Sequence, residues 1–368
     1  MDSTSLAQPG QQIKPNVTLE MAKEMASKLY GLRVKEIHEL NAYDDRNFHI
    51  LVDDIESKTI KRTWVHGYVL KIMNSLDSKN LLLIDGQKEI LIFLTKYKII
   101  CPNPVPNLQG FFYSLEEIPN GPEKSNHMVR LLEYQPGTIL YHIPCTKEIL
   151  FETGRYVANL DNILKGFSHS AYKSYKSLWS LESVPNLTKF MFAVKDEDKA
   201  RMAAEVIEVF NKEVIPILNK LEKGMIHGDF NEQNILCENC EDGWHISGIL
   251  DFGDSHYSCY IFELAITICY MMLQSKDMDP LEASGYVLAG YSAVRKLPEV
   301  EYKLLKICVA ARFCQSLVLG AYSYSLNPTN DYVMITAKLG WKHLHYLWNT
   351  PSESIHCKWE EIKETMNV

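Results

Sequence analysis

The pattern of hydrophobic and polar positions changes once along the chain, at Pro136 and Gly137. Before this break, short apolar and β-branched runs predict strands, and two stretches with helical spacing predict helices. The predicted strands cover residues 34–40, 48–52, 63–73, 111–115 and 128–134, and the helices cover residues 19–29 and 85–97. After the break, helical spacing predominates over residues 147–164, 196–221, 263–272, 281–291, 301–324 and 332–347, with a strand-like run at residues 246–250. The sequence therefore predicts an α+β fold with a strand-rich N-terminal lobe and a mainly helical C-terminal lobe.

Composition narrows the class of protein. A chain of 368 residues exceeds what one hydrophobic core usually holds, which agrees with two lobes. The net charge of −8 argues against a nucleic-acid or anionic-membrane partner. The longest apolar run, residues 261–273, is interrupted by Glu263 and is too short to span a bilayer. Nine scattered cysteines and a polar N-terminus without an apolar signal segment predict a cytoplasmic protein.

Two polar motifs lie close together in the C-terminal lobe. The first reads HGDFNEQN and contains Asp229 and Asn234, and the second reads DFG and begins at Asp251. Either motif alone is typical of a surface turn, because Asp, Asn and Gly favour turns. Together and in this order, they match the catalytic loop and the metal-binding segment of protein-kinase-like enzymes. The pair therefore favours a phosphoryl-transfer site.

The chemistry of phosphoryl transfer explains these residue types. The reaction depends on positioning and charge neutralisation more than on covalent help from the protein. One carboxylate accepts or orients the proton of the attacking hydroxyl, and Asp229 suits this role. Mg²⁺ prefers oxygen ligands and keeps several waters, so Asn234 and Asp251 are the predicted metal ligands. His227 is expected to support the loop by packing and hydrogen bonding.

The N-terminal lobe contains candidates for nucleotide binding. Lys71 lies within an apolar strand, where a lysine needs a partner or a solvated face, and it is the best phosphate-binding candidate. Residues 41–47 lie where a glycine-rich loop would cover the phosphates, yet they contain no glycine. Asn47 and backbone amides are the predicted phosphate donors instead. The backbone from Leu132 to Tyr134 is predicted to meet the nucleotide base.

The sequence does not identify the acidic partners of Lys71 and Arg312. A kinase lysine is normally held by an acid from the following helix, and Asp85, Gln87 and Glu89 all lie in the right region. Arg312 lies in the apolar stretch VAARFCQSLVLGAY, where an arginine needs an anion. It either recognises a substrate carboxylate or forms a salt bridge with an acid such as Glu263.

Longer stretches carry a family resemblance. HGDFNEQNIL, ILDFGD, VLKI around Lys71 and VRLLEYQPG resemble the aminoglycoside phosphotransferase and choline kinase superfamily. Within it, YDDRNFHI, SGILDFGDSHY, FELAITICYMM, VLAGY, ARFCQSLVLGAYS and TAKLGWKHL resemble the hydroxylysine kinases, over nearly the whole chain. The resemblance implies a bilobal protein-kinase-like fold. We expect residues 1–17 to be a disordered leader, residues 18–135 a nucleotide-binding lobe, and residues 136–368 a catalytic and substrate-binding lobe.

The resemblance also implies a reaction. It points to transfer of the γ-phosphoryl group of GTP to the 5-hydroxyl of 5-hydroxy-L-lysine, with Mg²⁺ and in the cytoplasm. The GTP preference is inherited from the resemblance alone, so ATP stays open as donor. Hydroxylysine carries two ammonium groups and one carboxylate, so Asp254 and Glu263 are candidate ammonium partners and Arg312 is a candidate carboxylate partner. Gln87 departs from the glutamate expected beside Lys71.

Two alternatives accompany this interpretation. The first is a kinase for another small hydroxylated amine or sugar, such as choline, homoserine, methylthioribose or an aminoglycoside. The second is a non-catalytic pseudokinase that binds nucleotide. The glycine-free turn favours the pseudokinase, whereas the joint presence of Lys71, Asp229, Asn234 and Asp251 opposes it.

Overall fold

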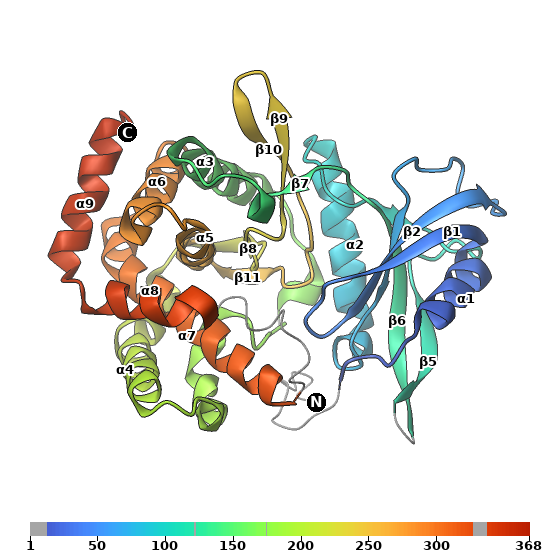
Figure 1. Ribbon diagram of the computed structural model, residues 1–368, viewed down its shortest axis with the longest axis horizontal. Helices are drawn as coiled ribbons and strands as arrows, with labels where there is room; N and C mark the ends of the chain where they lie inside the picture. The colour runs from blue at the N-terminus through green and yellow to red at the C-terminus, as the bar shows by residue number, and fades with distance from the viewer. Residues whose placement is uncertain (1–12, 121–122, 174, 327–336) are drawn as a thin grey trace. The chain divides into compact units, whose positions relative to one another are not determined.

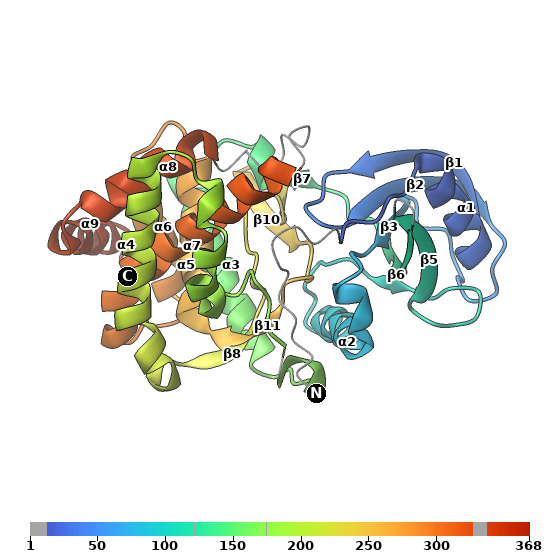
Figure 2. The ribbon, with the colours of Figure 1, turned by 90° about the horizontal axis from the view of Figure 1, so that it is seen from below.

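The computed structural model describes residues 13–120, 123–173, 175–326 and 337–368, which form two compact units (Figures 1 and 2). The N-terminal unit consists of the described residues up to Pro136 together with His169–Ala171. The C-terminal unit consists of Gly137–Ser168 and the described residues from Tyr172 onward. The units therefore meet in the sequence where the hydrophobic pattern changes.

The predicted leader is partly ordered. Residues 1–12 lie outside the described residues. Lys14 donates through Nζ to two backbone oxygens of the turn after the first strand, at 3.0 and 3.1 Å. Val17 is buried in the core of the N-terminal unit. The prediction of a disordered leader over residues 1–17 is therefore wrong for residues 13–17.

The N-terminal unit is an antiparallel sheet with two helices. Its strands are β1 (Leu32–Leu40), β2 (Arg46–Ile55), β3 (Tyr68–Ile72), β4 (Pro104–Val105), β5 (Ser114–Asn120) and β6 (Glu123–Glu133), and its helices are α1 (Leu19–Tyr30) and α2 (Leu81–Lys96). The strand order is β1-β2-β3-β6-β4, and β5 pairs with β6. Thr18 caps α1 through its side chain, and Gly31, with φ of 68°, ends it. One face of α1 packs on the sheet and closes the core of this unit.

The opposite face of this sheet carries the polar candidates. Side chains alternate along a strand, so the neighbours of buried core residues point away from the core. The strand register places Asn47 opposite Lys71 and Lys71 opposite Arg130. These three residues therefore form a row across β2, β3 and β6 on the face that α1 does not cover.

Two predicted boundaries shift for local reasons. The strand predicted at residues 111–115 begins only at Ser114, because Asn107 folds the preceding residues into a turn by accepting two backbone N–H groups at 3.0 Å through Oδ1. The helix predicted over residues 196–221 ends at Glu213 and continues as a 3₁₀ helix. Pro216 lacks an N–H and cannot continue the α-helical hydrogen bonds.

The C-terminal unit is mainly helical. Its helices are α3 (Lys147–Leu164), α4 (Glu197–Glu213), α5 (Tyr260–Gln274), α6 (Pro280–Ser292), α7 (Glu299–Leu326), α8 (Ala337–Asn349) and α9 (Ser352–Thr365). Helix α5 contacts α3, α6 and α7 and is almost wholly buried (Figure 1). Helix α7 is long and apolar enough to cross a bilayer by composition, but 94% of its apolar window is buried within the described part of the chain. Of the helix predicted over residues 332–347, residues 332–336 lie outside the described residues.

Short strands bring the two motifs together in this unit. They are β7 (Thr138–Ile139), β8 (Lys223–Ile226), β9 (Ile235–Cys240), β10 (Gly243–Ile249) and β11 (His256–Cys259). The first motif connects β8 to β9, and the second connects β10 to β11. Since β9 pairs with β10 and β8 pairs with β11, both connections lie at the same end of these strands.

Candidate active site

The β9–β10 hairpin places the two predicted metal ligands on adjacent segments. Ile235 pairs with Ile249 at the end of the hairpin, so Asn234 and Leu250 are the next residues on the two strands. The backbone N–H of Leu250 donates to the carbonyl of Asn234 at 2.7 Å. Asp251 follows directly. A β-hairpin therefore joins the two motifs.

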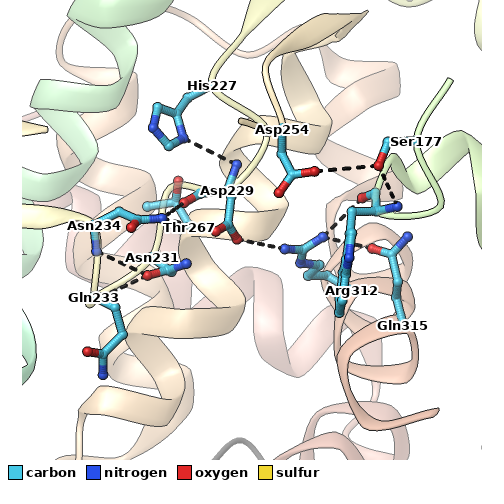
Figure 3. A network of polar contacts seen from close by, with 12 residues as sticks. Ser177, His227, Asp229, Asn231, Gln233, Asn234, Asp254, Thr267, Arg312 and Gln315 are labelled. Carbon is cyan, nitrogen blue, oxygen red and sulfur yellow. Dashed lines mark hydrogen bonds and ion pairs between the residues drawn. The ribbon is translucent and has the colours of Figure 1, made fainter. Parts of the chain in front are cut away.

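His227 ties the first motif to the second. Its Nε2 lies 2.8 Å from the carbonyl oxygen of Leu250, and its Nδ1 accepts the backbone N–H of Asp229 at 3.2 Å (Figure 3). Burial lowers the pKa of His227, so the neutral ring donates from Nε2 and accepts at Nδ1. The ring also packs edge-on against Phe252, with 4.7 Å between centroids. His227 thus supports the loop, as the sequence predicts.

Gly228 allows the tight turn of the first motif. Its φ is +82°, and a Cβ at this position would lie 2.3 Å from the carbonyl oxygen of Asp254. Its N–H donates to Glu263 Oε2 at 2.8 Å. Glu263 is fully buried, and burial, with a contribution from nearby Asp229, raises the pKa of Glu263 to about 7. The prediction that Glu263 binds a substrate ammonium group is therefore wrong, since this side chain holds the loop from within α5.

Both oxygens of the Asp229 carboxylate accept hydrogen bonds. Asn234 Nδ2 donates to Oδ2 at 3.0 Å and to the Asp229 carbonyl at 2.9 Å (Figure 3). Arg312 Nη2, from α7, lies 3.0 Å from Oδ1. Asn231 shapes the loop between them, because its Oδ1 accepts the N–H of Asn234 at 3.2 Å. The carboxylate is therefore held in one orientation from two sides.

Of the two roles predicted for Arg312, recognition of a substrate carboxylate is wrong, whereas a salt bridge to an acid of the same unit is present, although the acid is not Glu263. Its side chain is only 1% exposed, so a substrate carboxylate cannot reach it, and its acidic partner is Asp229 instead of Glu263. Nothing in the local sequence reveals this pair, because its members lie 83 residues apart. An arginine within an apolar helix signals a buried anion, but the signal does not identify which one.

Asn234 and Asp251 supply oxygen atoms that suit a magnesium ion. The Asn234 amide nitrogen is used on Asp229, which leaves the amide oxygen facing away from that contact. Asp251 is exposed, accepts the N–H of Gly253 at 3.0 Å, and has a φ of 49°, which is uncommon for a residue other than glycine. Among the described residues, no group of three or more His, Cys, Asp or Glu side chains could hold a metal. Mg²⁺ needs fewer protein ligands, because it keeps waters and binds substrate phosphates.

Asp254 remains a candidate for contact with substrate. It is half-buried, and its Oδ1 accepts the hydroxyl of Ser177 at 3.4 Å (Figure 3). Its carbonyl oxygen lies 2.7 Å from His256 Nδ1, which fixes the chain just after the DFG motif. Its carboxylate belongs to the same unit as Asp229 and lies on the segment that carries Asp251.

In the N-terminal unit, Lys71 pairs with an acid that the sequence interpretation missed. Its Nζ lies 3.1 Å from Asp45 Oδ2, with both side chains mostly buried. Asn74 donates to Asp45 Oδ1 through its backbone N–H at 2.8 Å and through Nδ2 at 3.1 Å. Asp45 lies in the glycine-free turn before β2, so this turn supplies the acid for the lysine.

The acids expected beside Lys71 have other partners. Asp85 and Glu89 both pair with Lys88, at 2.6 and 3.0 Å. Gln87 is buried in α2. Asn47 stays a candidate phosphate donor, because it lies opposite Lys71 on β2.

The turn before β2 is also strongly acidic. Burial raises the pKa of Asp44 to about 7, and the neighbouring carboxylates Asp45 and Asp77 add to the effect. Burial likewise raises the pKa of Asp77. The positive charges of Lys71 and Arg130 act against the rise in the pKa of Asp77.

The segment predicted to meet the nucleotide base is only partly available. The N–H of Tyr134 donates to Gly67 at 3.0 Å, and its carbonyl accepts Trp64 Nε1 at 2.7 Å. The Tyr134 N–H is thus taken by Gly67, and only its carbonyl keeps a second lone pair for a base. Leu132 lies opposite Val69 on the same face as Lys71, so its side chain, rather than its backbone, suits contact with a base.

Comparisons with known proteins agree with this geometry. A model of the phosphotransferase enzyme family matches residues 47–297. A hydroxylysine kinase of Xenopus laevis is 39% identical over 363 residues, which cover 96% of this chain and 95% of that protein. A hydroxylysine kinase of Bos taurus is 37% identical over 365 residues, with coverage of 96% and 95%. A solved amicoumacin kinase in complex with AMP-PNP and Ca²⁺ has 16% identity and a TM-score of 0.65, covering 91% of this chain and 95% of that one, which shows a shared kinase-like fold.

Proposed function

The chain belongs to the phosphotransferase enzyme family and is a small-molecule kinase with an alcohol acceptor, and from this premise we propose its substrates. We propose transfer of the γ-phosphoryl group of GTP to the 5-hydroxyl of 5-hydroxy-L-lysine. The observation that supports the reaction type is Asp229, a carboxylate oriented by Asn234 and Arg312 in a catalytic loop. Similarity to relatives named hydroxylysine kinase supports the acceptor. The choice of GTP rests on the resemblance to those kinases.

Asp229 would orient the acceptor hydroxyl and accept its proton. An ionised carboxylate offers about four acceptor sites, so two protein donors still leave room for a hydroxyl group. The arrangement of Asn234 and Arg312 keeps the carboxylate from turning away. The attacking oxygen would therefore meet a base that is already positioned, as phosphoryl transfer requires.

Asn234 and Asp251 would hold Mg²⁺ through oxygen atoms, and Lys71 and Asn47 would contact the phosphates of the nucleotide. Bound Mg²⁺ neutralises charge on the phosphates and on the leaving group. The protein contributes by placing the two ligands on the paired ends of β9 and β10. Asp45 keeps Lys71 oriented within the sheet face.

The charge of the proposed acceptor suits Asp254. Hydroxylysine carries two ammonium groups, and a half-buried carboxylate is a favourable partner for one of them. Asp254 lies three residues after Asp251, so an ammonium group bound there would keep the acceptor beside the DFG segment. All nine cysteines are free thiols, which supports our proposal of a cytoplasmic location, where GTP and Mg²⁺ are available.

The test is turnover by the purified protein with Mg²⁺ and either GTP or ATP, offered hydroxylysine, lysine, choline or kanamycin. Asp229→Ala serves as the blank. Asp242→Ala, which removes an exposed acid from the turn of the β9–β10 hairpin, serves as the matched control. We expect phosphorylation of hydroxylysine but not of lysine, with GTP preferred, and loss of activity in the blank alone.

The remaining outcomes separate the parts of the proposal. Turnover of choline or kanamycin instead of hydroxylysine would contradict the proposed acceptor but agree with the proposed phosphoryl transfer. A preference for ATP would contradict the donor. Nucleotide binding without phosphorylation of any acceptor would contradict the kinase activity and favour the pseudokinase.

A further inference from the structure

Arg312 is a buried arginine whose acidic partner is the catalytic carboxylate. It comes from the middle of α7, and its side chain is 1% exposed, whereas that of Asp229 is 25% exposed. Burying a guanidinium is unfavourable unless an anion and hydrogen-bond acceptors surround it. The buried guanidinium of Arg312 therefore contacts Oδ1 of the more exposed Asp229 carboxylate.

The surroundings of Arg312 fix its guanidinium from several directions. Nη1 donates to the carbonyl of Trp179 at 3.1 Å and to Gln315 Oε1 at 2.8 Å. The rings of Trp179 and Tyr270 each lie 5.3 Å from the guanidinium carbon. Two aromatic rings and three acceptors therefore leave this side chain little freedom to turn.

Gln315 extends this arrangement to a neighbouring segment. It lies three residues after Arg312 on α7, and its Nε2 donates to the carbonyls of Leu178 and Ser180 at 2.8 and 3.0 Å. The same segment includes Ser177, which contacts Asp254 (Figure 3). Helix α7 thus connects the carboxylate of Asp229 with the segment at residues 177–180.

We propose that Arg312 is a positioning residue for phosphoryl transfer, which orients the Asp229 carboxylate toward the acceptor hydroxyl and is itself oriented by Gln315. The proposal rests on the proposed role of Asp229. Asn234 contacts the carboxylate from the same loop as Asp229, whereas Arg312 contacts it from helix α7. Arg312 therefore fixes the carboxylate itself to a buried helix, in addition to the backbone contact of Gly228 with Glu263 on α5.

The first experiment measures Arg312→Ala with GTP and hydroxylysine. We expect kcat to fall about 100-fold, because a small misplacement of a reacting group has an effect of this size. The KM values of both substrates should stay close to those of the wild type. Added guanidinium ion should raise kcat of Arg312→Ala but not of the wild type, since it can enter the vacated site.

Arg295 provides a matched control. It is also buried, its guanidinium carbon lies 3.8 Å from the ring of Tyr260, and its acidic partner is Glu222 at 2.6 Å. None of these partners belongs to the catalytic loop. Arg295→Ala should unfold at a lower temperature, yet keep its kcat and show no response to guanidinium. An equal loss of kcat in both variants would assign the effect to stability and overturn the positioning role.

A second pair of variants answers the case in which Arg312→Ala does not fold. Asp229→Asn combined with Arg312→Met removes both charges and leaves no buried ion unpaired. If Arg312 acts through Asp229, the double variant should be no less active than Asp229→Asn alone. A further loss of about 100-fold would show that Arg312 acts independently and would contradict the proposal.

A modified acceptor separates this role from recognition of a substrate carboxylate. The diamine 1,5-diaminopentan-2-ol retains the hydroxyl and both amines of hydroxylysine but lacks the carboxylate. Positioning predicts the same fall in kcat for Arg312→Ala with either acceptor. Equal use of the diamine by wild type and variant would overturn the proposal. A wild type that phosphorylates no alcohol would instead contradict the proposed function, and this inference would fall with it.

Discussion

Asp229 receives its two side-chain donors from different parts of the chain. Asn234 belongs to the same loop, whereas Arg312 comes from a helix 83 residues later. One donor fixes the shape of the loop, and the other fixes the loop against the helical core. The acid is therefore oriented before any substrate arrives, which reduces the entropy lost on reaching the reactive geometry.

A single substitution tests recognition of the amine. Asp254→Asn keeps the size of the side chain and its contact with Ser177, but removes the negative charge. We expect KM for hydroxylysine to rise about tenfold, as loss of one charged hydrogen bond implies, with KM for GTP unchanged. Steady-state kinetics with each substrate varied in turn measures this. An unchanged KM for hydroxylysine would exclude Asp254 as the ammonium partner.

The residues that the sequence identifies are those whose roles depend on local spacing. Asp229, Asn234 and Asp251 belong to two short motifs, and the structure places them on adjacent segments. Asp45 and Arg312 could not be assigned in this way, because their partners are set by the packing of the sheet and of α7. A charged residue type predicts that a partner exists, but the fold decides which residue it is.

At the scale of elements, the β9–β10 hairpin joins the two halves of the proposed metal site. Its paired ends carry Asn234 and Asp251, and its turn carries Asp242 on the opposite end. The hydrophobic pattern predicts its second strand, at residues 246–250. The ends of helices and strands are harder to predict: α4 ends early at the approach to Pro216, and β5 starts late because the Asn107 side chain forms a turn.

The hairpin leads to a prediction on metal dependence. Asp251→Asn replaces a charged ligand by a neutral one, so the Mg²⁺ concentration that gives half-maximal activity should rise about tenfold or more. Asp242→Asn, on the same hairpin, should leave that concentration unchanged. The measurement is a Mg²⁺ titration of initial rate after treatment with a chelator. Equal Mg²⁺ dependence in wild type and Asp251→Asn would contradict the assignment.

Helix α5 leads to a prediction on pH. Burial raises the pKa of Glu263 from 4.5 to about 7 in the folded chain. The folded state therefore binds more protons than the unfolded state in this range, and Glu263 lowers stability progressively as pH rises from 4.5 to about 7. Glu263→Gln keeps an acceptor for the N–H of Gly228 and removes the titration. Relative to wild type, the variant should become more stable across this interval and change no further above it.

Denaturant unfolding at several pH values measures this difference. Glu299→Gln is a useful comparison, because the partner Lys303 lowers the pKa of the exposed Glu299 carboxyl. That variant should lose stability relative to wild type as pH rises, if it changes at all. A pH-independent difference between Glu263→Gln and wild type would show that the Glu263 carboxyl titrates normally.

At the scale of the whole molecule, each unit has its own part of the chemistry. The N-terminal unit has a separate core and presents Lys71 and Asn47 on the sheet face that α1 leaves uncovered. The C-terminal unit carries the proposed catalytic acid and both proposed metal ligands. Nucleotide binding and catalysis should therefore be separable by substitutions in different units.

Thermal unfolding with and without Mg²⁺ and GTP tests that separation. A ligand present at about 100 times its dissociation constant stabilises the folded state by about 2.7 kcal/mol, so the unfolding temperature of the wild type should rise by several degrees. Asp229→Asn should keep this rise, because Asp229 is proposed to act on the acceptor hydroxyl. Lys71→Met should lose most of it, because the phosphates lose their lysine.

The control is Lys88→Met, which removes a lysine of the same unit that pairs with Asp85 and Glu89 on α2. This variant should respond to nucleotide as the wild type does. If Lys71→Met and Lys88→Met both kept the full rise in unfolding temperature, Lys71 would have no part in binding the phosphates. If Asp229→Asn lost the rise, the catalytic acid would also be needed to bind nucleotide, and the two functions would not divide between the units.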